Sequence, residues 1–240
     1  MEDRHLLISD VDGTLLGDDR ALQKFVAWYE EHRDRLRLVY NSGRLVSSIV
    51  ESIETTNLPA PDAIIGGVGT QIREYPSNDE IGQWPAQTRS WQPLIICGLL
   101  AEYPELELQP PEFLAEYKIS YYVADAPAEL LSEIRGRLEQ IDCPVDLIYS
   151  SHRDLDVLPR GVNKGTASAY LASYWSIPES NVFVSGDTGN DLELFNNGFR
   201  GIVVGNAHPE LKSLNSDLIY QARQSHAAGV QEGLSYWFNQ

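Results

Sequence analysis

The sequence is poor in cysteine: only Cys97 and Cys143 occur among its 240 residues, and they lie far apart. Neither has the nearby cysteine or histidine that a zinc ribbon requires, and two cysteines do not make a disulfide scaffold. This scarcity favours a reducing compartment, so we predict a cytoplasmic protein. The N-terminal residues are not typical of a signal or transit peptide.

The sequence also lacks a long apolar segment and an excess of positive charge. Its longest apolar run, residues 94–101, is much shorter than the roughly 20 residues that cross a bilayer. Lysine and arginine number 18 against 35 aspartates and glutamates, a formal net charge of −17. This charge argues against nucleic-acid and membrane partners. It does not exclude a phosphorylated substrate, because a bound metal ion can reverse the local potential.

What the sequence does contain is an alternation of short apolar runs and helical patterns at both ends of the chain. Strands are predicted over residues 5–9, 37–40 and 63–65, with helical periodicity between them. The same alternation returns near the C-terminus, with strands predicted over residues 182–185 and 201–204. This order predicts an α/β fold with a doubly wound parallel sheet.

The middle of the sequence has a different order of elements. The predicted elements are a helix over residues 86–102 that Pro93 interrupts, strands over 105–109 and 117–123, a helix over 127–141, and strands over 145–149 and 154–158. This order predicts an α+β domain inserted into the α/β core. We place the core at residues 1–83 and 160–240, and the inserted cap at residues 84–159.

Two acidic clusters follow predicted strands of the core. Asp10 and Asp12 follow the first strand, and Asp187 and Asp191 lie in a glycine-containing segment after residues 182–185. In open α/β sheets ligands bind at the carboxyl ends of the strands, and such carboxylates are suitable ligands for Mg²⁺. The alternative is a solvated turn rich in aspartate.

Ser42 and Lys164 are two further candidates. Ser42 follows the second strand, where its hydroxyl could donate a hydrogen bond to a phosphoryl oxygen, although a serine there is also typical of a helix N-cap. Lys164 begins a predicted helix and would neutralise phosphate charge, although a single lysine is usually a solvated surface charge.

These clusters, in this order, resemble the motifs of the haloacid dehalogenase superfamily of phosphohydrolases over the full chain. The resemblance implies the catalytic set Asp10 (nucleophile), Asp12 (general acid and base), Ser42 and Lys164. It implies Mg²⁺ as cofactor, with the ligand set Asp10, Asp12, Asp187 and Asp191. It implies phosphate binding by Ser42, Gly43, Lys164 and Asn190. The predicted insert resembles the C2B type of cap in that superfamily.

Finer motifs narrow the resemblance. Residues 118–121, 154–159, 163–165 and 205–211 resemble the sucrose-phosphatase group, and residues 40–44, 64–70 and 184–191 are most similar to mannosylfructose-phosphate phosphatases. Sucrose-phosphatases more often have threonine where Ser42 stands. Both groups act on a disaccharide with a fructosyl 6-phosphate, which implies such a substrate here. Trehalose phosphate and glucosylglycerol phosphate stay open as alternatives, as does association with a glycosyltransferase synthase.

The cap is expected to select the sugar. Alternation along the strand over residues 117–123 puts Lys118 and Ser120 on one face and Ile119 and Tyr121 on the other. If Ile119 packs into the cap, the polar face points at the core, so we predict that Lys118 and Ser120, together with Arg44, bind the sugar. The alternative is an ordinary half-solvated sheet face.

Three other functions are compatible with parts of this sequence pattern. A sugar phosphomutase would form the same aspartyl-phosphate and return the phosphoryl group to another hydroxyl. A phosphorylated binding module of the response-regulator type also uses acidic residues, a hydroxyl and a lysine, but it lacks a cap and carries the phosphorylated aspartate on a middle strand. A catalytically inactive scaffold is the third, although every expected catalytic position is filled.

Overall fold

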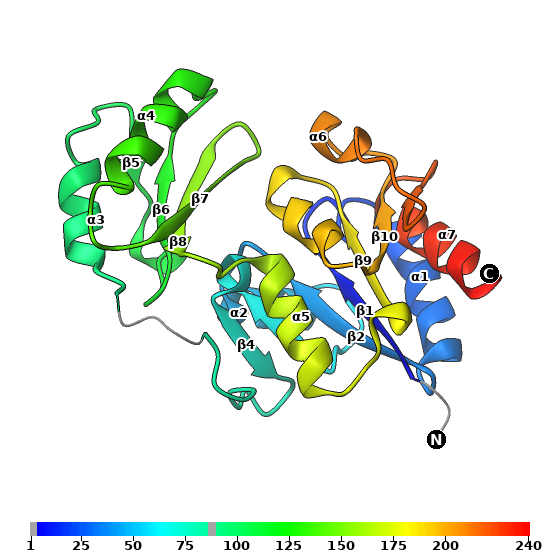
Figure 1. Cartoon of the computed structure of the whole chain (residues 1–240). Helices are drawn as coiled ribbons and strands as arrows, with labels where there is room; N and C mark the ends of the chain where they lie inside the picture. Colours follow the sequence, from blue (N-terminus) through cyan, green and yellow to red (C-terminus); the bar gives the residue numbers. More distant parts are fainter. Residues whose placement is uncertain (1–3, 86–89) are drawn as a thin grey trace.

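The computed structural model describes residues 4–85 and 90–240, and within this part of the chain the strands form two separate sheets (Figure 1). The larger has seven strands in the order β11-β10-β9-β1-β2-β3-β4. Its parallel strands are β1 (His5–Ser9), β2 (Leu36–Asn41), β3 (Ala63–Gly66), β9 (Val182–Gly186), β10 (Arg200–Val203) and β11 (Ile219–Gln221). The edge strand β4 (Gln71–Glu74) runs antiparallel to β3. The predicted parallel sheet is thus confirmed, and β4 and β11 are additions to the prediction.

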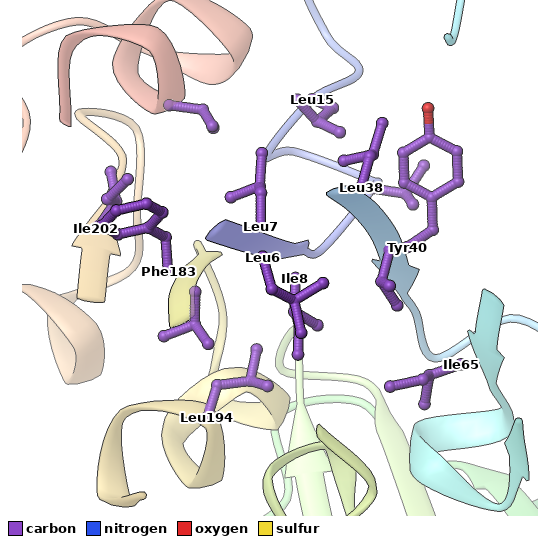
Figure 2. Packing of buried hydrophobic residues seen from close by; sticks show 14 of the residues in the cluster. Leu6, Leu7, Ile8, Leu15, Leu38, Tyr40, Ile65, Phe183, Leu194 and Ile202 are labelled. Atoms are coloured by element: carbon purple, nitrogen blue, oxygen red, sulfur yellow. The ribbon is translucent and has the colours of Figure 1, made fainter. Parts of the chain in front are cut away.

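Helices connect and cover the strands of this core sheet. They are α1 (Asp19–His32), α2 (Val46–Thr55), α5 (Lys164–Tyr174), α6 (Pro209–Lys212) and α7 (His226–Phe238), with the 3-10 helices η1 (Gly67–Gly69), η3 (Glu179–Asn181) and η4 (Gly189–Asn196). In Figure 2, Leu7 and Leu38 lie on one side of the sheet, and Ile8 and Leu194 lie on the other. Both faces are therefore buried, as expected when crossover helices cover a parallel sheet.

The cap has the predicted order of two helix–strand–strand units. Its elements are α3 (Pro93–Leu100), β5 (Glu107–Leu108), the 3-10 helix η2 (Pro111–Phe113), β6 (Ile119–Tyr122), α4 (Ala128–Leu138), β7 (Val145–Ser150) and β8 (Asp154–Pro159). The strands form an antiparallel sheet in the order β5-β6-β8-β7. Ile119 and Tyr121 pack with α3 and α4 in the apolar core of the cap, so the other face of β6 is free for polar residues.

One detail of the cap differs from the prediction. Pro93 begins α3 instead of interrupting a longer helix. Proline is well tolerated at the first helical position, because the N–H that it lacks would have no partner within the helix. Residues 86–89 of the predicted helix lie outside the described residues.

The chain enters and leaves the cap near one edge of the core (Figure 1). On the return path β8 ends at Pro159 and α5 begins at Lys164. The division of the chain into a core of residues 1–83 and 160–240 and a cap of residues 84–159 stays a prediction. None of the helices among the described residues is long and apolar enough to cross a membrane.

Candidate active site

Three aspartates meet at the carboxyl ends of neighbouring core strands. Asp10 follows β1 and Asp187 follows β9, which pairs in parallel with β1, and the backbone N–H of Asp10 donates to the Ser185 carbonyl at 3.0 Å. Asp191 lies in η4, where its Oδ2 accepts bonds from the N–H groups of Asp187 and Thr188. One carboxylate oxygen from each of the three aspartates lies within 4.8 Å of the other two. All three side chains are buried.

Burial and the neighbouring charges raise the pKa of two of these carboxyl groups, those of Asp10 and Asp187. Burial raises the pKa of Asp10 well above its ordinary value, and the charges of Asp191 and Asp187 add to this effect while Lys164 opposes it. Burial, followed by the charge of Asp191, raises the pKa of Asp187 to about 7. A hydrogen bond from the Thr14 hydroxyl and the charge of Lys164 act in the opposite direction. The cluster therefore has a deficit of positive charge.

Lys164 supplies one buried positive charge to this cluster. Its Nζ donates to Oδ1 of Asp10 and to Oδ1 of Asp191, both at 2.7 Å, and the side chain is fully buried. Burial lowers the pKa of Lys164, but the charges of Asp10 and Asp191 and their hydrogen bonds outweigh it and raise the pKa. The ammonium is therefore charged, and the alternative of a solvated surface lysine is wrong.

A small hard cation would balance the negative charge that Lys164 leaves uncompensated in this cluster. Three buried carboxylates with converging oxygens are a typical donor set for such an ion, and one lysine does not balance them. Among the described residues the Asp12 carboxylate is not part of this group. Its side chain is 58% exposed and forms an ion pair with Nε of Arg44 at 2.8 Å.

The turn that follows Asp12 keeps its shape through Gly13. This residue has φ +77°, and a Cβ atom there would lie 2.2 Å from Oδ2 of Asp187. The Gly13 carbonyl accepts a hydrogen bond from Nδ2 of Asn206 at 2.7 Å. Glycine is required here because a side chain would occupy the space of the acidic cluster.

Ser42, Gly43 and Asn190 lie beside the acidic cluster. Ser42 follows β2, the other neighbour of β1, and is almost fully buried with its N–H bonded to the Ile65 carbonyl. A Cβ atom on Gly43 would lie 3.5 Å from Nδ2 of Asn190, so the loops after β2 and β9 adjoin. The structure thus brings the predicted phosphate-binding residues to one place.

A cavity of about 500 Å³ lies above these residues, between the core and the cap. The core contributes Asp10, Asp12, Ser42, Gly43, Arg44, Thr188 and Asn190, and the cap contributes Gln109, Phe113, Lys118, Tyr122, Ser150, Ser151, Arg153, Asp154 and Asp156. This volume is in the range of small-molecule sites. Asp10 of the acidic cluster forms part of its floor, and polar and aromatic side chains of the cap form its roof.

Lys118 and Ser120 belong to a buried polar group in this roof. Nζ of Lys118 donates to the Phe113 carbonyl at 3.0 Å and to the Ser120 hydroxyl, and it lies 3.0 Å from Oδ1 of Asp156. The Ser120 hydroxyl donates to the same Asp156 oxygen at 2.6 Å. Lys118 and Ser120 are 4% and 0% exposed, so they do not form a half-solvated face. The ammonium thus has two hydrogen bonds and one ion pair, all with atoms of the cap.

The sequence reading missed several residues of the roof, above all Asp156. Asp154 and Asp156 alternate on β8, and the pairing of β8 with β6 sets Asp156 directly opposite Ser120. Nε2 of Gln109 donates to Oδ1 of Asp154 at 2.9 Å, and the guanidinium of Arg153 lies over the Tyr122 ring. The alternation over residues 154–158 indicates that Asp154 and Asp156 share one face of the strand, but only the pairing with β6 shows that Asp156 lies beside Ser120.

Comparison with known proteins supports the motifs. A family model described as sucrose-6F-phosphate phosphohydrolase matches residues 3–238. A mannosylfructose-phosphate phosphatase of Agrobacterium fabrum is 37% identical over 99% of this chain and 98% of its own length. Sucrose-phosphatase 2 of Nicotiana tabacum is 31% identical over 97% of this chain, which spans 59% of that longer protein.

A solved structure has the same fold over nearly the whole length of both chains. It is the sucrose-phosphatase from Synechocystis sp. PCC6803 in complex with sucrose and phosphate, with a TM-score of 0.93, 31% identity and 99% coverage of each chain. The resemblance inferred from the motifs is thus confirmed, as is the fold class.

Proposed function

This chain belongs to the sucrose-6F-phosphate phosphohydrolase family, and we propose that it is a Mg²⁺-dependent phosphatase that hydrolyses a phosphorylated disaccharide to sugar and inorganic phosphate. The observation that carries the proposal is the cavity, which joins a carboxylate and phosphate-binding floor to a polar roof. The names of the relatives support mannosylfructose-phosphate and sucrose 6-phosphate as the first substrates to test. Trehalose phosphate and glucosylglycerol phosphate are the alternatives.

Asp10 is the proposed nucleophile. Its Oδ1 accepts a hydrogen bond from Lys164, which leaves Oδ2 to attack phosphorus. The attack forms an aspartyl-phosphate and breaks the bond between phosphorus and the sugar oxygen, while Asp12 donates a proton to that oxygen. Asp12 then takes a proton from the water that hydrolyses the aspartyl-phosphate, so inorganic phosphate is released and both carboxyl groups return to their initial states.

The position of Asp12 suits this role. The ion pair with Arg44 keeps its carboxylate at the cavity, where Asp12, Arg44 and the cap residues all contribute to the lining. Arg44 is itself held by a 2.9 Å hydrogen bond to Ser52. The sugar contact predicted for Arg44 stays a prediction, and its partner in the structure is Asp12.

The phosphoryl group would lie between Asp10 and the loops that carry Ser42, Gly43 and Asn190. Ser42 and Asn190 offer side-chain donors, and Gly43 offers a backbone N–H beside them. Lys164 orients Asp10 and balances its charge. Asp10, Asp187 and Asp191 would hold Mg²⁺, which when bound would supply the positive charge that stabilises the transferring phosphoryl group. The fourth ligand inferred from the resemblance, Asp12, stays a prediction.

For the sugar, the roof supports a division of roles. Because the Lys118 ammonium forms its two hydrogen bonds and its ion pair within the cap, we propose that Asp156 accepts hydrogen bonds from sugar hydroxyls, and that Lys118 and Ser120 hold and neutralise it. Tyr122 and Phe113 would cover the apolar faces of the sugar rings. Direct sugar contacts from Lys118 and Ser120 stay predictions.

The test is release of inorganic phosphate from a panel of substrates. The panel contains mannosylfructose phosphate, sucrose 6-phosphate, trehalose 6-phosphate, glucosylglycerol phosphate and fructose 6-phosphate. We expect the highest kcat/KM for one of the first two, with Asp10→Asn as the inactive control. Appearance of an isomeric sugar phosphate without free phosphate would instead favour the phosphomutase. No turnover of any disaccharide phosphate would contradict the proposed substrate class.

Two further properties stay predictions. Cytoplasmic location rests on the scarcity of cysteine, and Cys97 and Cys143 are both free thiols in the structure. Association with a glycosyltransferase synthase rests on the resemblance alone, and co-purification of the two enzymes would test it.

A further inference from the structure

Lys164 stands where the chain returns from the cap to the core. The last cap strand ends at Pro159, and only residues 160–163 separate it from Lys164, the first residue of α5. The ammonium of Lys164 must remain within hydrogen-bond distance of Asp10 and Asp191. Any movement of the cap would therefore act on the backbone of this residue through a very short connection.

The connection that enters the cap also contacts the region around Lys164. Nε1 of Trp84 donates to the Gly69 carbonyl at 2.7 Å. Gly69 packs against the peptide between Asn163 and Lys164, because a Cβ atom at Gly69 would lie 2.2 Å from the Asn163 carbonyl oxygen. Trp84 also packs on Tyr170 of α5, with ring centroids 5.0 Å apart. The entering connection thus contacts α5 directly at Tyr170 and, through Gly69, at the start of the helix.

Asn41, the last residue of β2, ties this turn to the core sheet. Its Nδ2 donates to the Lys164 carbonyl at 3.0 Å and to the Ser168 hydroxyl at 2.9 Å. The Ser168 hydroxyl itself donates to the Lys164 carbonyl at 2.8 Å. Asn41, Lys164 and Ser168 are each 0% exposed. Since both neighbours act as acceptors toward Asn41, its NH₂ group must face them, and the orientation of the amide is defined.

We propose that Asn41 is a positioning residue that fixes the backbone of Lys164, and thereby its ammonium, independently of the cap. The inference rests on the proposed function, since it concerns the group that orients Asp10. β2 is an interior strand held on both sides by β1 and β3, so it is a rigid support. Asn41 also directly precedes Ser42. The end of β2 would therefore fix the positions of both the proposed phosphate-binding hydroxyl and Lys164.

The first test compares steady-state kinetics of wild type, Asn41→Asp and Asn41→Ala. Asn41→Asp keeps the volume of the side chain, and its ionised form has neither donor. We expect kcat to fall by roughly 10- to 100-fold for both p-nitrophenyl phosphate and the disaccharide phosphate, because small displacements of supporting groups have effects of this size. KM should change by less than about 3-fold, because Asn41 does not line the cavity. Ser168→Ala, which keeps the bond from Asn41 to Lys164, should lose less activity.

Ile49→Val is the matched control, since Ile49 is fully buried in α2 and the substitution removes one methylene from the core. It should lower the melting temperature without lowering kcat per folded molecule. If Asn41→Asp and Asn41→Ala behave like this control, Asn41 is only structural and the proposal is overturned.

Hydrogen exchange gives a readout that does not need activity. Backbone amides of residues 164–170 should exchange faster in Asn41→Ala than in wild type, whereas Ile49→Val should leave that segment unchanged. Unchanged exchange in Asn41→Ala would overturn the proposal even if activity fell. If wild type released phosphate from no substrate, the proposed function would fail, and the exchange experiment would still decide whether Asn41 anchors α5.

Discussion

The core and the cap present polar side chains to the same cavity in different ways. In the core, Asp10, Ser42 and Asp187 each directly follow a parallel strand, so the order of the strands brings them together. In the cap, Ser120 and Asp156 lie within strands and meet because β6 and β8 pair antiparallel in one register. The core residues at the strand ends can therefore be recognised from short local motifs. The group formed by Ser120 and Asp156 in the cap cannot, because it depends on the pairing of two segments that are far apart in the sequence.

The two regions also differ in how their charges are balanced. The carboxylates of the core outnumber the single buried lysine beside them. In the cap, Lys118 and Asp156 form one pair with a serine between them. The core is thus suited to accept a cation, whereas the cap holds a defined arrangement of hydrogen-bonding groups.

The comparison is tested most strongly at Asp10. Asp10→Asn keeps the shape of the side chain but removes its negative charge, so kcat should fall by at least about 10³-fold on the disaccharide phosphate and on p-nitrophenyl phosphate alike. Substrate binding should persist, which can be measured by calorimetry with the inactive variant. Residual activity within about tenfold of wild type would contradict the role of Asp10.

Metal removal should also affect both substrates. Chelation should abolish phosphate release and Mg²⁺ should restore it, because Lys164 alone does not neutralise three carboxylates. Ca²⁺, which prefers larger and more flexible coordination, should bind but support turnover poorly. Full activity in excess chelator would remove the metal from the proposal.

A substitution in the cap should separate the two substrates. Lys118→Ala removes the cation that holds Asp156, so KM for the disaccharide phosphate should rise by about 5- to 150-fold, the equivalent of about 1–3 kcal/mol. Hydrolysis of p-nitrophenyl phosphate should hardly change. Arg137→Ala, which removes an exposed ion pair between Arg137 of α4 and Glu102, is the control and should alter the hydrolysis of neither substrate. Equal losses on both substrates would show that Lys118 supports folding or chemistry instead of sugar selection.

The smallest expected effect is a pH dependence of stability that comes from the core. The pKa of Asp187 is raised to about 7 in the folded protein, whereas an unfolded aspartate titrates near 4. Between these values the folded state binds more protons than the unfolded state, so the free energy of unfolding should fall as pH rises from about 4 to about 7. The slope from this group is at most about 1.4 kcal/mol per pH unit.

Denaturant unfolding of metal-free protein at several pH values measures this slope. Asp187→Asn should remove this contribution, and Mg²⁺ should flatten the slope in wild type because it binds the ionised carboxylates. An identical slope in wild type and Asp187→Asn would show that Asp187 does not titrate in this range.

The sequence determined the parts of this protein that depend on local pattern. The apolar runs before Asp10, Asn41 and Asp187 predicted the parallel strands and the sheet edge at which the site lies, because a short buried segment followed by polar residues is recognisable without its neighbours. Period-two alternation likewise put Lys118 and Ser120 on one face of the strand predicted over residues 117–123. The strands β4 and β11 were missed because they are short and contain few apolar residues: β4 reads Gln-Ile-Arg-Glu and β11 reads Ile-Tyr-Gln.

Only the tertiary structure decided which of these groups touch. It paired Asp12 with Arg44 and gave the Lys118 ammonium its hydrogen bonds and its ion pair within the cap. It also brought Asp156 to the cavity and joined Asn41 to Lys164 across 123 positions of the sequence. The reason is physical: a hydrogen bond or an ion pair depends on distances of about 3 Å, and strand register and helix packing set such distances between segments far apart in the chain.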